Sequence, residues 1–201
     1  MSRVVLATRN LGKVAELRRI LVPLGIDLIG LDDVTPYEPA PETGATFREN
    51  ALAKAAEAAA ATGLPAVADD SGLEVDALNG MPGVLSARWA GQHGDDAANL
   101  ALLLGQLAEV PDGRRGASFR CAAAAVLPGT GAQLCVEGAL RGRLLRSPRG
   151  EGGFGYDPVF VPEGLDVTTA ELAPGEKDAI SHRGIAFREL GPLLAAALSR
   201  R

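Results

Sequence analysis

Residues 4–31 read VVLATRNLGKVAELRRILVPLGIDLIGL, and this stretch decides the fold class. An apolar run rich in β-forming residues, 4–7, is followed by a polar turn, a helical pattern over 13–24 and a second apolar run over 26–31. One face of the predicted helix consists of Leu17, Ile20, Leu21 and Leu24. A strand, a helix and a strand in this order favour an α/β fold in which part of the sheet is parallel.

Helices and strands continue along the rest of the chain. We predict helices over 45–62, 95–107 and 185–199, and strands over 66–68, 73–78, 118–127, 133–145 and 158–161. Pro128-Gly129-Thr130-Gly131 separates two of these strands and predicts a hairpin, although the Ala-rich residues 121–126 are also compatible with a helix. No repeat or interdomain linker interrupts the pattern, so residues 1–201 are expected to form one domain with room for two lobes.

Composition limits the possible partners. The chain has 201 residues and a net charge of −5, which excludes the basic surface that binding to a nucleic-acid polymer requires. A single nucleotide needs only a few cations and a metal ion. The sequence shows neither a secretory signal nor an apolar run of membrane-spanning length, so we expect a cytoplasmic protein. Cys121 and Cys135 lie in apolar stretches and are expected to be buried free thiols.

The turn Thr8-Arg9-Asn10-Leu11-Gly12-Lys13 joins the first strand to the first helix. Its amides, hydroxyl group and ammonium group form the kind of cluster that binds anions at a helix N-terminus. Alternatively, Asn10 only caps the helix and Lys13 is solvated. The turn is not a Walker loop, because no glycine stands five residues before Gly12 and Val14 replaces the required Ser or Thr.

Two adjacent carboxylates, Asp69 and Asp70, follow the apolar residues 66–68. Carboxylates at the end of a buried strand must be hydrated, paired or bound to a metal ion. One interpretation places Mg2+ here, with a second carboxylate from Glu42 and further oxygen ligands from a phosphate and from water. In the alternative, one aspartate caps the next element and the other faces solvent.

A Gly-rich loop, 150–155, matches the spacing G-x-G-x-x-G, but Pro158 follows too soon for the helix that a dinucleotide site requires. We interpret the glycines as a loop that lets the backbone approach a flat ligand beside Phe154 and Tyr156.

Cationic groups gather before the last predicted helix, at Lys177 and at Ser181-His182-Arg183. Positive charge is unfavourable at that end of a helix, so an anionic or acceptor-rich ligand would compensate it. A simpler interpretation makes Ser181 an N-cap in a solvated first turn. The other histidine, His93, lies in a Gly-rich turn and is expected to be structural or exposed.

Together and in this order, these segments resemble the inosine/xanthosine triphosphate pyrophosphatase family, also called the Ham1-like family. The resemblance covers nearly the whole chain. It is carried by residues 8–13, Glu42-Thr43-Gly44, Phe47, Glu49-Asn50-Ala51, residues 68–72, Gly80-Met81-Pro82-Gly83, residues 154–158, Lys177 and Ser181-His182-Arg183.

This resemblance implies an elongated mixed β-sheet flanked by helices, two lobes around a central substrate cleft, and a homodimer. It implies hydrolysis of the purine nucleoside triphosphates ITP, dITP and XTP to the monophosphate and pyrophosphate, with Mg2+ as cofactor. Such a reaction keeps deaminated purines out of DNA and RNA.

The resemblance also implies a role for each matching residue. Those expected to bind the triphosphate are Thr8, Arg9, Asn10, Leu11, Gly12 and Lys13. Those expected to contact the rest of the substrate are Ser71, Phe154, Gly155, Tyr156, Asp157, Lys177, His182 and Arg183. Glu42 and Asp70 would hold Mg2+, and Asp70 would accept a proton from the attacking water, with Asp69 as the competing candidate.

Base selection has a physical explanation in this interpretation. A 6-oxo purine offers an acceptor to Arg183 or to an amide of the pocket, whereas the 6-amino group of adenine would face another donor. A Maf-like nucleotide pyrophosphatase is the nearest alternative, but residues 154–157 and Ser181-His182-Arg183 argue against it. A non-catalytic nucleotide sensor would lack metal carboxylates, yet Glu42, Asp69 and Asp70 are all present.

Overall fold

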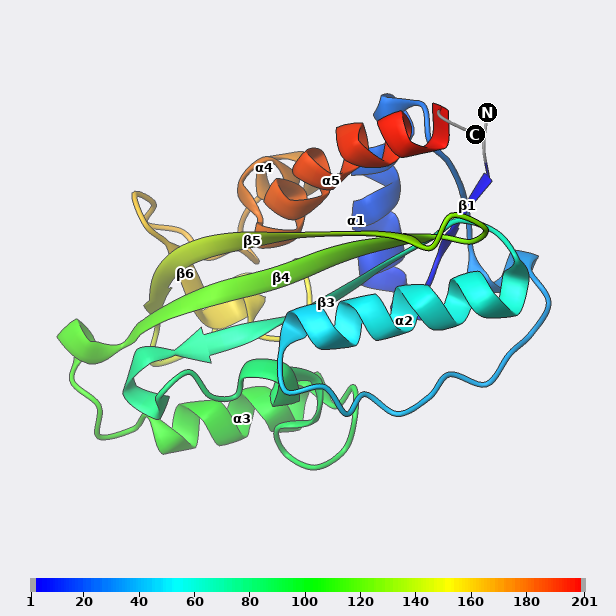
Figure 1. Ribbon diagram of the computed structural model, residues 1–201. Helices are drawn as coiled ribbons and strands as arrows, with labels where there is room; N and C mark the ends of the chain where they lie inside the picture. The colour runs from blue at the N-terminus through cyan, green and yellow to red at the C-terminus, as the bar shows by residue number, and fades with distance from the viewer. Residues whose placement is uncertain (1–2, 200–201) are drawn as a thin grey trace. The chain divides into compact units, whose positions relative to one another are not determined.

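The computed structural model describes residues 3–199, and for Leu11 the backbone alone. Its strands are β1 (Arg3–Leu6), β2 (Asp27–Ile29), β3 (Ala66–Val75), β4 (Gly116–Leu127), β5 (Ala132–Leu144) and β6 (Phe160–Pro162). Its α-helices are α1 (Leu11–Leu21), α2 (Phe47–Thr62), α3 (Asp96–Gln106), α4 (Pro174–Ile180) and α5 (His182–Ser199) (Figure 1).

These strands form one mixed sheet in the order β2-β1-β3-β4-β5-β6. β1 runs parallel to β2 and to β3, whereas β5 and β6 are antiparallel. The predicted α/β class is therefore confirmed, as is the pair of long neighbouring strands around the turn at 128–131.

The described chain divides into two compact units. One consists of residues 3–70, 121–138 and 182–199, and the other of residues 71–120 and 139–181. Each unit has its own hydrophobic core.

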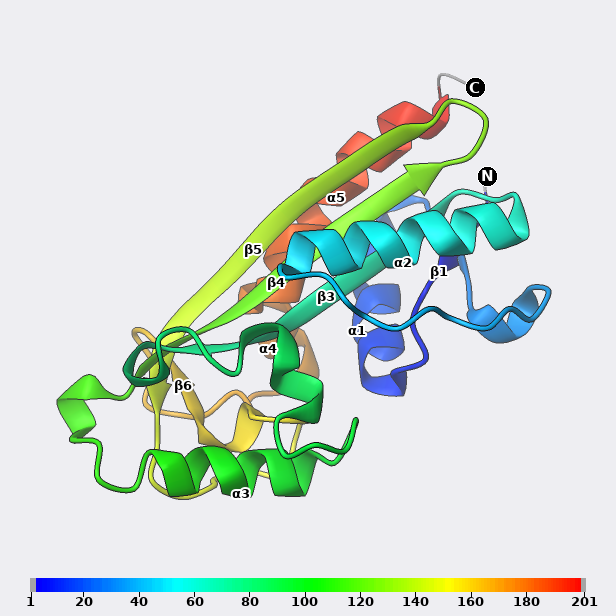
Figure 2. The ribbon, with the colours of Figure 1, turned by 60° about the horizontal axis from the view of Figure 1, so that its bottom comes forward.

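In the first unit, helices cover both faces of the strands. Val4 and Leu6 pack in one cluster with α1 and α5, whereas the alternate residues Val5 and Ala7 pack in another with α2. Figure 2 shows α2 on one side of the strands and α5 on the other. The alternation arises because successive strand side chains point to opposite faces. It continues along β4, where the alanines 122–125 are fully buried and let helices approach both faces closely.

In the second unit, α3 packs on its strands through an aliphatic and aromatic core. The rings of Phe119 and Phe160 lie 4.5 Å apart between centroids. Arg115 is buried beside this core, and its guanidinium donates to the carbonyl oxygens of Leu107, Leu144 and Leu145 at 2.6–2.9 Å. A buried guanidinium with three carbonyl partners replaces the hydrogen bonds that it loses from water.

The largest correction to the sequence prediction concerns β3. Two strands over 66–68 and 73–78 were expected, but a single strand spans Ala66–Val75, and residues 76–78 form a 3-10 turn. Asp69 and Asp70 therefore lie inside a strand and not at its end, a place where aspartate is disfavoured. Each of the two carboxylates meets donors from distant parts of the chain, as described below, and this offsets their poor strand propensity.

A second correction is α4, a helix that is absent from the elements predicted above. The helix starts at Pro174, whose fixed backbone angle suits the first helical position, and Glu176 accepts a hydrogen bond from the amide of Ala173 at 2.9 Å. Lys177 is consequently a buried helical residue, and Ser181 follows this helix directly instead of lying in a solvated turn.

The remaining differences are smaller. The first helix ends at Leu21, and a 3-10 turn containing Pro23 follows it, so Leu24 is 40% exposed instead of contributing to the apolar face. Cys121 is buried as predicted, but Cys135 is only half-buried, and both thiols are free. His93 is exposed. Within residues 3–199, no helix is both long enough and apolar enough to cross a membrane.

Candidate active site

The turn between β1 and α1 is organised by two of its own side chains. The amide of Asn10 donates to the hydroxyl oxygen of Thr8 at 3.2 Å, and the Asn10 carboxamide oxygen accepts from the amide of Lys13 at 3.1 Å. Asn10 is therefore the N-cap of α1, as one of the two interpretations predicted. The first turn of α1 contains no acidic residue, so its positive end is available to an anion.

The side chain of Lys13 is not solvated, and this part of the simpler interpretation is wrong. Its ammonium lies 2.9 Å from the Oδ2 atom of Asp69. Arg9 and Asn10 are exposed, Thr8 is half-buried and Gly12 is exposed. Of the predicted triphosphate-binding residues, Lys13 is therefore anchored within the first unit, whereas Arg9, Asn10 and Gly12 lie at the surface.

Asp69 is the anion of a buried network of charges. Its Oδ2 atom also accepts from the Nε atom of Arg183 at 3.2 Å, and the same guanidinium pairs with Glu16 of α1. Burial alone would raise the pKa of Asp69, but Lys13, Arg183 and Lys54 outweigh it and hold this pKa well below its usual range. Burial lowers the pKa of Arg183, but the carboxylates of Asp69 and Glu16 outweigh this effect and raise it. Asp69 is thus a poor proton acceptor.

Asp70 lies in a different environment, because adjacent strand residues point to opposite faces. Asp69 meets α1 and α5, whereas Asp70 meets α2. The Asn50 carboxamide donates to Oδ2 of Asp70 at 3.0 Å, and the Lys54 ammonium donates to Oδ1 at 3.0 Å. Burial raises the pKa of Asp70, although Lys54, Lys13 and the hydrogen bond from Asn50 oppose it. Asp70 is therefore the better proton acceptor of the two.

Lys54 also lies between Glu42 and Asp70. Its ammonium lies 2.9 Å from Oε1 of Glu42 and 3.0 Å from Oδ1 of Asp70. Burial disfavours the protonated ammonium, but Asp70, Asp69 and Glu42 outweigh this effect and raise the pKa of Lys54. The two carboxylates predicted to hold Mg2+ thus share one cation.

This donor set fits a magnesium ion completed by its substrate. Within the described residues, no group of three or more His, Cys, Asp or Glu side chains is arranged to hold a metal ion. Mg2+ commonly uses only one or two carboxylates and takes its other ligands from phosphate oxygens and water. Glu42 and Asp70 provide two such oxygen donors around a point where a positive charge already lies.

The second unit contains most of the residues predicted to contact the purine, whereas His182 and Arg183 belong to the first unit. Asp157 is buried, and its Oδ2 atom accepts from the amide of Phe154 at 2.8 Å and from the Lys177 ammonium at 2.6 Å. Its Oδ1 atom accepts from the hydroxyl of Thr169 at 2.8 Å. The ammonium of Lys177 lies 4.9 Å from the centre of the Phe154 ring, within the range of a cation–π contact. Asp157 thereby fixes both Phe154 and Lys177.

The neighbouring residues of this loop are held in a similar way. The hydroxyl of Tyr156 is buried and donates to the carbonyl oxygen of Ser86 at 2.8 Å, so its side chain builds the loop instead of presenting a donor to a ligand. The amide of Gly155 donates to Oδ2 of Asp96 in the first turn of α3 at 2.8 Å.

Two further predicted substrate-binding residues lie outside this loop. Ser71 is half-buried on β3, and His182 begins α5 and is buried.

Sequence reasoning missed four of the residues that organise these clusters. Lys54 and Asn50 lie four residues apart on α2, the spacing that puts two side chains on one helix face. This shared face was the available signal, and apart from Asn50 the buried residues of the helix are alanines. Glu16 and Asp96 gave no such signal, because acidic residues in helices are usually solvated.

Comparison with known proteins identifies the family of the chain. The model of the Ham1 family matches residues 4–193. The dITP/XTP pyrophosphatase of Nocardia farcinica is 66% identical over 203 residues, covering 100% of this chain and 98% of that protein. That of Mycolicibacterium paratuberculosis is 62% identical and covers 96% of both chains.

Solved structures show the same fold. The crystal structure of a dITP/XTP pyrophosphatase from Mycobacterium abscessus has a TM-score of 0.77 at 58% identity, covering 96% of this chain and 98% of that one. A HAM1 protein from Coxiella burnetii has a TM-score of 0.85 at 45% identity, covering 98% of this chain and 100% of that one. The match extends over nearly the full length in sequence and in structure, and the chain therefore belongs to the Ham1 family.

Proposed function

We propose that this protein is a nucleoside-triphosphate pyrophosphatase that hydrolyses dITP, ITP and XTP to the monophosphate and pyrophosphate. This activity removes deaminated purine nucleotides before they enter DNA or RNA. Relatives that are 58–66% identical over nearly the whole chain carry the name dITP/XTP pyrophosphatase. The observation that carries the proposal is the juxtaposition of Glu42 and Asp70 on one cation, because this pair suits phosphate hydrolysis with a divalent ion.

The proposal divides the substrate between two groups of residues. The residues that bind the triphosphate are Thr8, Arg9, Asn10, Leu11, Gly12 and Lys13. Those that contact the purine or its surroundings are Ser71, Phe154, Gly155, Tyr156, Asp157, Lys177, His182 and Arg183. Since Tyr156 and Asp157 are engaged within the protein, we assign them the task of shaping the loop that carries Phe154.

In the proposed mechanism, Asp70 accepts a proton from the water that attacks the α-phosphorus. The water oxygen bonds to that phosphorus, and the bond from phosphorus to the α,β-bridging oxygen breaks, so pyrophosphate leaves. Lys13 and the amides at the start of α1 stabilise the charge that spreads over the phosphate oxygens. When bound at Glu42 and Asp70, Mg2+ neutralises further phosphate charge. Asp69 is left out of the proton transfer, because its carboxylate already binds Lys13 and Arg183.

Several further features belong to the proposal. We assign Mg2+ as the metal, a homodimer as the assembly and the cytoplasm as the location. We also propose one domain with two lobes around a cleft, as the resemblance implies.

Base selection is assigned to Arg183 or to a backbone amide, which would select the 6-oxo purine. The two carboxylate partners of Arg183 would hold its donors in fixed directions.

The first test is a nucleotide panel. Purified protein is incubated with Mg2+ and ITP, dITP, XTP, ATP, GTP or TTP, and pyrophosphate and orthophosphate are measured separately. We expect pyrophosphate chiefly from ITP, dITP and XTP, because a site built on buried hydrogen bonds rejects a purine that leaves donors unpaired. Release of orthophosphate, or nucleotide binding with no turnover, would contradict the proposed activity.

A second test concerns the loop that carries Phe154. Asp96→Ala removes the acceptor of the Gly155 amide, so we expect the KM for dITP to rise about threefold to tenfold while kcat changes little. The control is Asp95→Ala, which removes the N-cap of α3 but leaves Asp96 and Gly155 in place. An equal rise of KM in both variants would mean that the helix cap, and not the contact to Gly155, accounts for the effect.

A further inference from the structure

The ammonium of Lys54 occupies a position between two carboxylates. It lies 2.9 Å from Glu42 and 3.0 Å from Asp70, with 21% of its side chain exposed. Two carboxylates that converge without a cation repel each other, and a positive charge between them removes this repulsion. In the protein without metal, Lys54 provides that charge.

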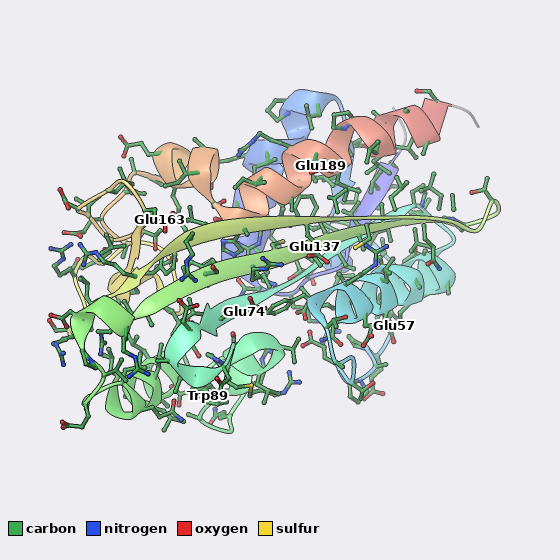
Figure 3. All side chains as sticks on the ribbon, turned by 60° about the vertical axis from the view of Figure 1, so that its left-hand side comes forward. Glu57, Glu74, Trp89, Glu137, Glu163 and Glu189 are labelled. Carbon is green, nitrogen blue, oxygen red and sulfur yellow. The ribbon has the colours of Figure 1, made fainter. Side chains whose placement is uncertain are left out.

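The converging geometry of the two carboxylates does not depend on Lys54. The loop that carries Glu42 is attached to α2 by three other side chains: Glu57 accepts from the amide of Ala40 at 2.7 Å, Asn50 from Gly44 at 2.8 Å, and Glu49 from Ala45 at 2.7 Å. Glu57 is labelled on α2 in Figure 3. Asp70 is held by its strand and by Asn50. Both carboxylates therefore stay in place when the ammonium leaves.

There is also space for water beside Lys54 and Glu42. A cavity of about 280 Å³ is lined by the loop residues 40–44 and by one face of α2, including Asn50, Lys54 and Glu57. Since one water takes about 30 Å³ of liquid volume, this space holds several water molecules. Mg2+ gives up its waters reluctantly, so a site that accepts it must accommodate some of them.

We propose that Lys54 is a resident counter-ion of the metal site, which neutralises the charge of Glu42 and Asp70 and competes with a divalent cation until the nucleotide arrives. This inference rests on the proposed function in taking these two carboxylates as the metal pair. A metal ion alone must displace the ammonium, whereas a metal ion that arrives with a triphosphate brings phosphate oxygens as additional ligands. Lys54 thus keeps the affinity of this site for free metal low.

The test measures metal binding without nucleotide. Mn2+ is titrated into the full-length protein, and its dissociation constant is determined by calorimetry and by the paramagnetic resonance signal of free Mn2+. We expect Lys54→Met to bind Mn2+ about tenfold more tightly than the unsubstituted protein, because a competing positive charge next to the site is gone. Lys54→Arg should keep the weak binding. Unchanged or weaker binding by Lys54→Met would overturn the inference.

Arg48→Met is the matched control. Arg48 is exposed on the same helix, so this variant removes one positive charge from α2 without touching Glu42 or Asp70. An increase in affinity equal to that of Lys54→Met would show a general charge effect and overturn the specific role of Lys54. If Lys54→Met does not fold, Lys54→Gln has a polar side chain of intermediate length and carries the same expectation.

Thermal unfolding gives an independent readout. In EDTA, Lys54→Met should melt at a lower temperature than the unsubstituted protein, because Glu42 and Asp70 then repel each other. Added Mn2+ should raise the melting temperature of Lys54→Met by more than that of the unsubstituted protein. An equal rise in both would contradict the displacement. These measurements need no substrate, so their failure is distinguishable from failure of the nucleotide panel.

Discussion

Asp70→Asn is expected to lower kcat for dITP hydrolysis by about 10³-fold or more while the protein stays folded. The substitution removes the proposed proton acceptor and one of the two carboxylates that pair with Lys54. The amide oxygen can still accept one hydrogen bond, from Asn50 or from Lys54, so the local packing survives. Steady-state kinetics with Mg2+ and dITP, together with denaturant unfolding, give both quantities.

The unfolding measurement distinguishes chemistry from folding. We expect the free energy of unfolding of Asp70→Asn to differ from that of the unsubstituted protein by no more than about 1 kcal/mol. A variant that retains a near-normal rate would remove Asp70 from its assigned role. A variant that loses activity only because it unfolds would leave the role to another residue.

Asp69→Asn should have the opposite signature, with a loss of about 3–5 kcal/mol in the free energy of unfolding. The variant leaves Lys13 and the buried guanidinium of Arg183 beside a neutral amide, and the cost of an uncompensated buried charge is large. Urea unfolding at neutral pH measures this difference. A loss below about 1 kcal/mol, which is typical of an exposed ion pair, would contradict the structural role of Asp69.

Two controls accompany this measurement. Asp76→Asn removes an ion pair with Arg141, but both side chains are about half-exposed, so we expect a loss of only about 0–1 kcal/mol. The second control is pH. The folded protein holds the pKa of Asp69 below its ordinary value, so the stabilisation is fully present above the unfolded pKa of about 3.9. The difference between Asp69→Asn and the unsubstituted protein should therefore be constant near neutrality and shrink as pH falls below about 4.

Short sequence patterns predicted most of the helices and strands, because neighbouring residues in the chain determine where these elements begin and end. The first strand and helix follow from a β-forming run, a capping asparagine and a helical apolar face, and the two long strands β4 and β5 follow from their turn residues. The single strand β3 could not be predicted in this way. Its two aspartates are stabilised by partners 16 to 114 residues away, which no local window contains.

The same distinction applies to the site. The residue types that suit phosphate, metal and purine were recognisable from the sequence, and the resemblance assigned them to one site. What each carboxylate binds was not recognisable. Asp69 and Asp70 look equivalent in the sequence, and only their contacts distinguish the carboxylate with a lowered pKa from the one with a raised pKa. Lys54 received no role from the sequence, and only the fold shows its contacts with Glu42 and Asp70.

The register of β3 determines which surroundings each of the two aspartates has. β1 fixes this strand through the pairs Val5 with Ala66 and Leu6 with Val67. A shift by one residue would exchange the faces of all following side chains. Asp69 would then face α2 and Asp70 would face the guanidinium of Arg183, so the two carboxylates would exchange surroundings. Insertions or deletions between Ala66 and Asp69 are thus excluded for a chemical reason, even though the strand itself could absorb the change in length.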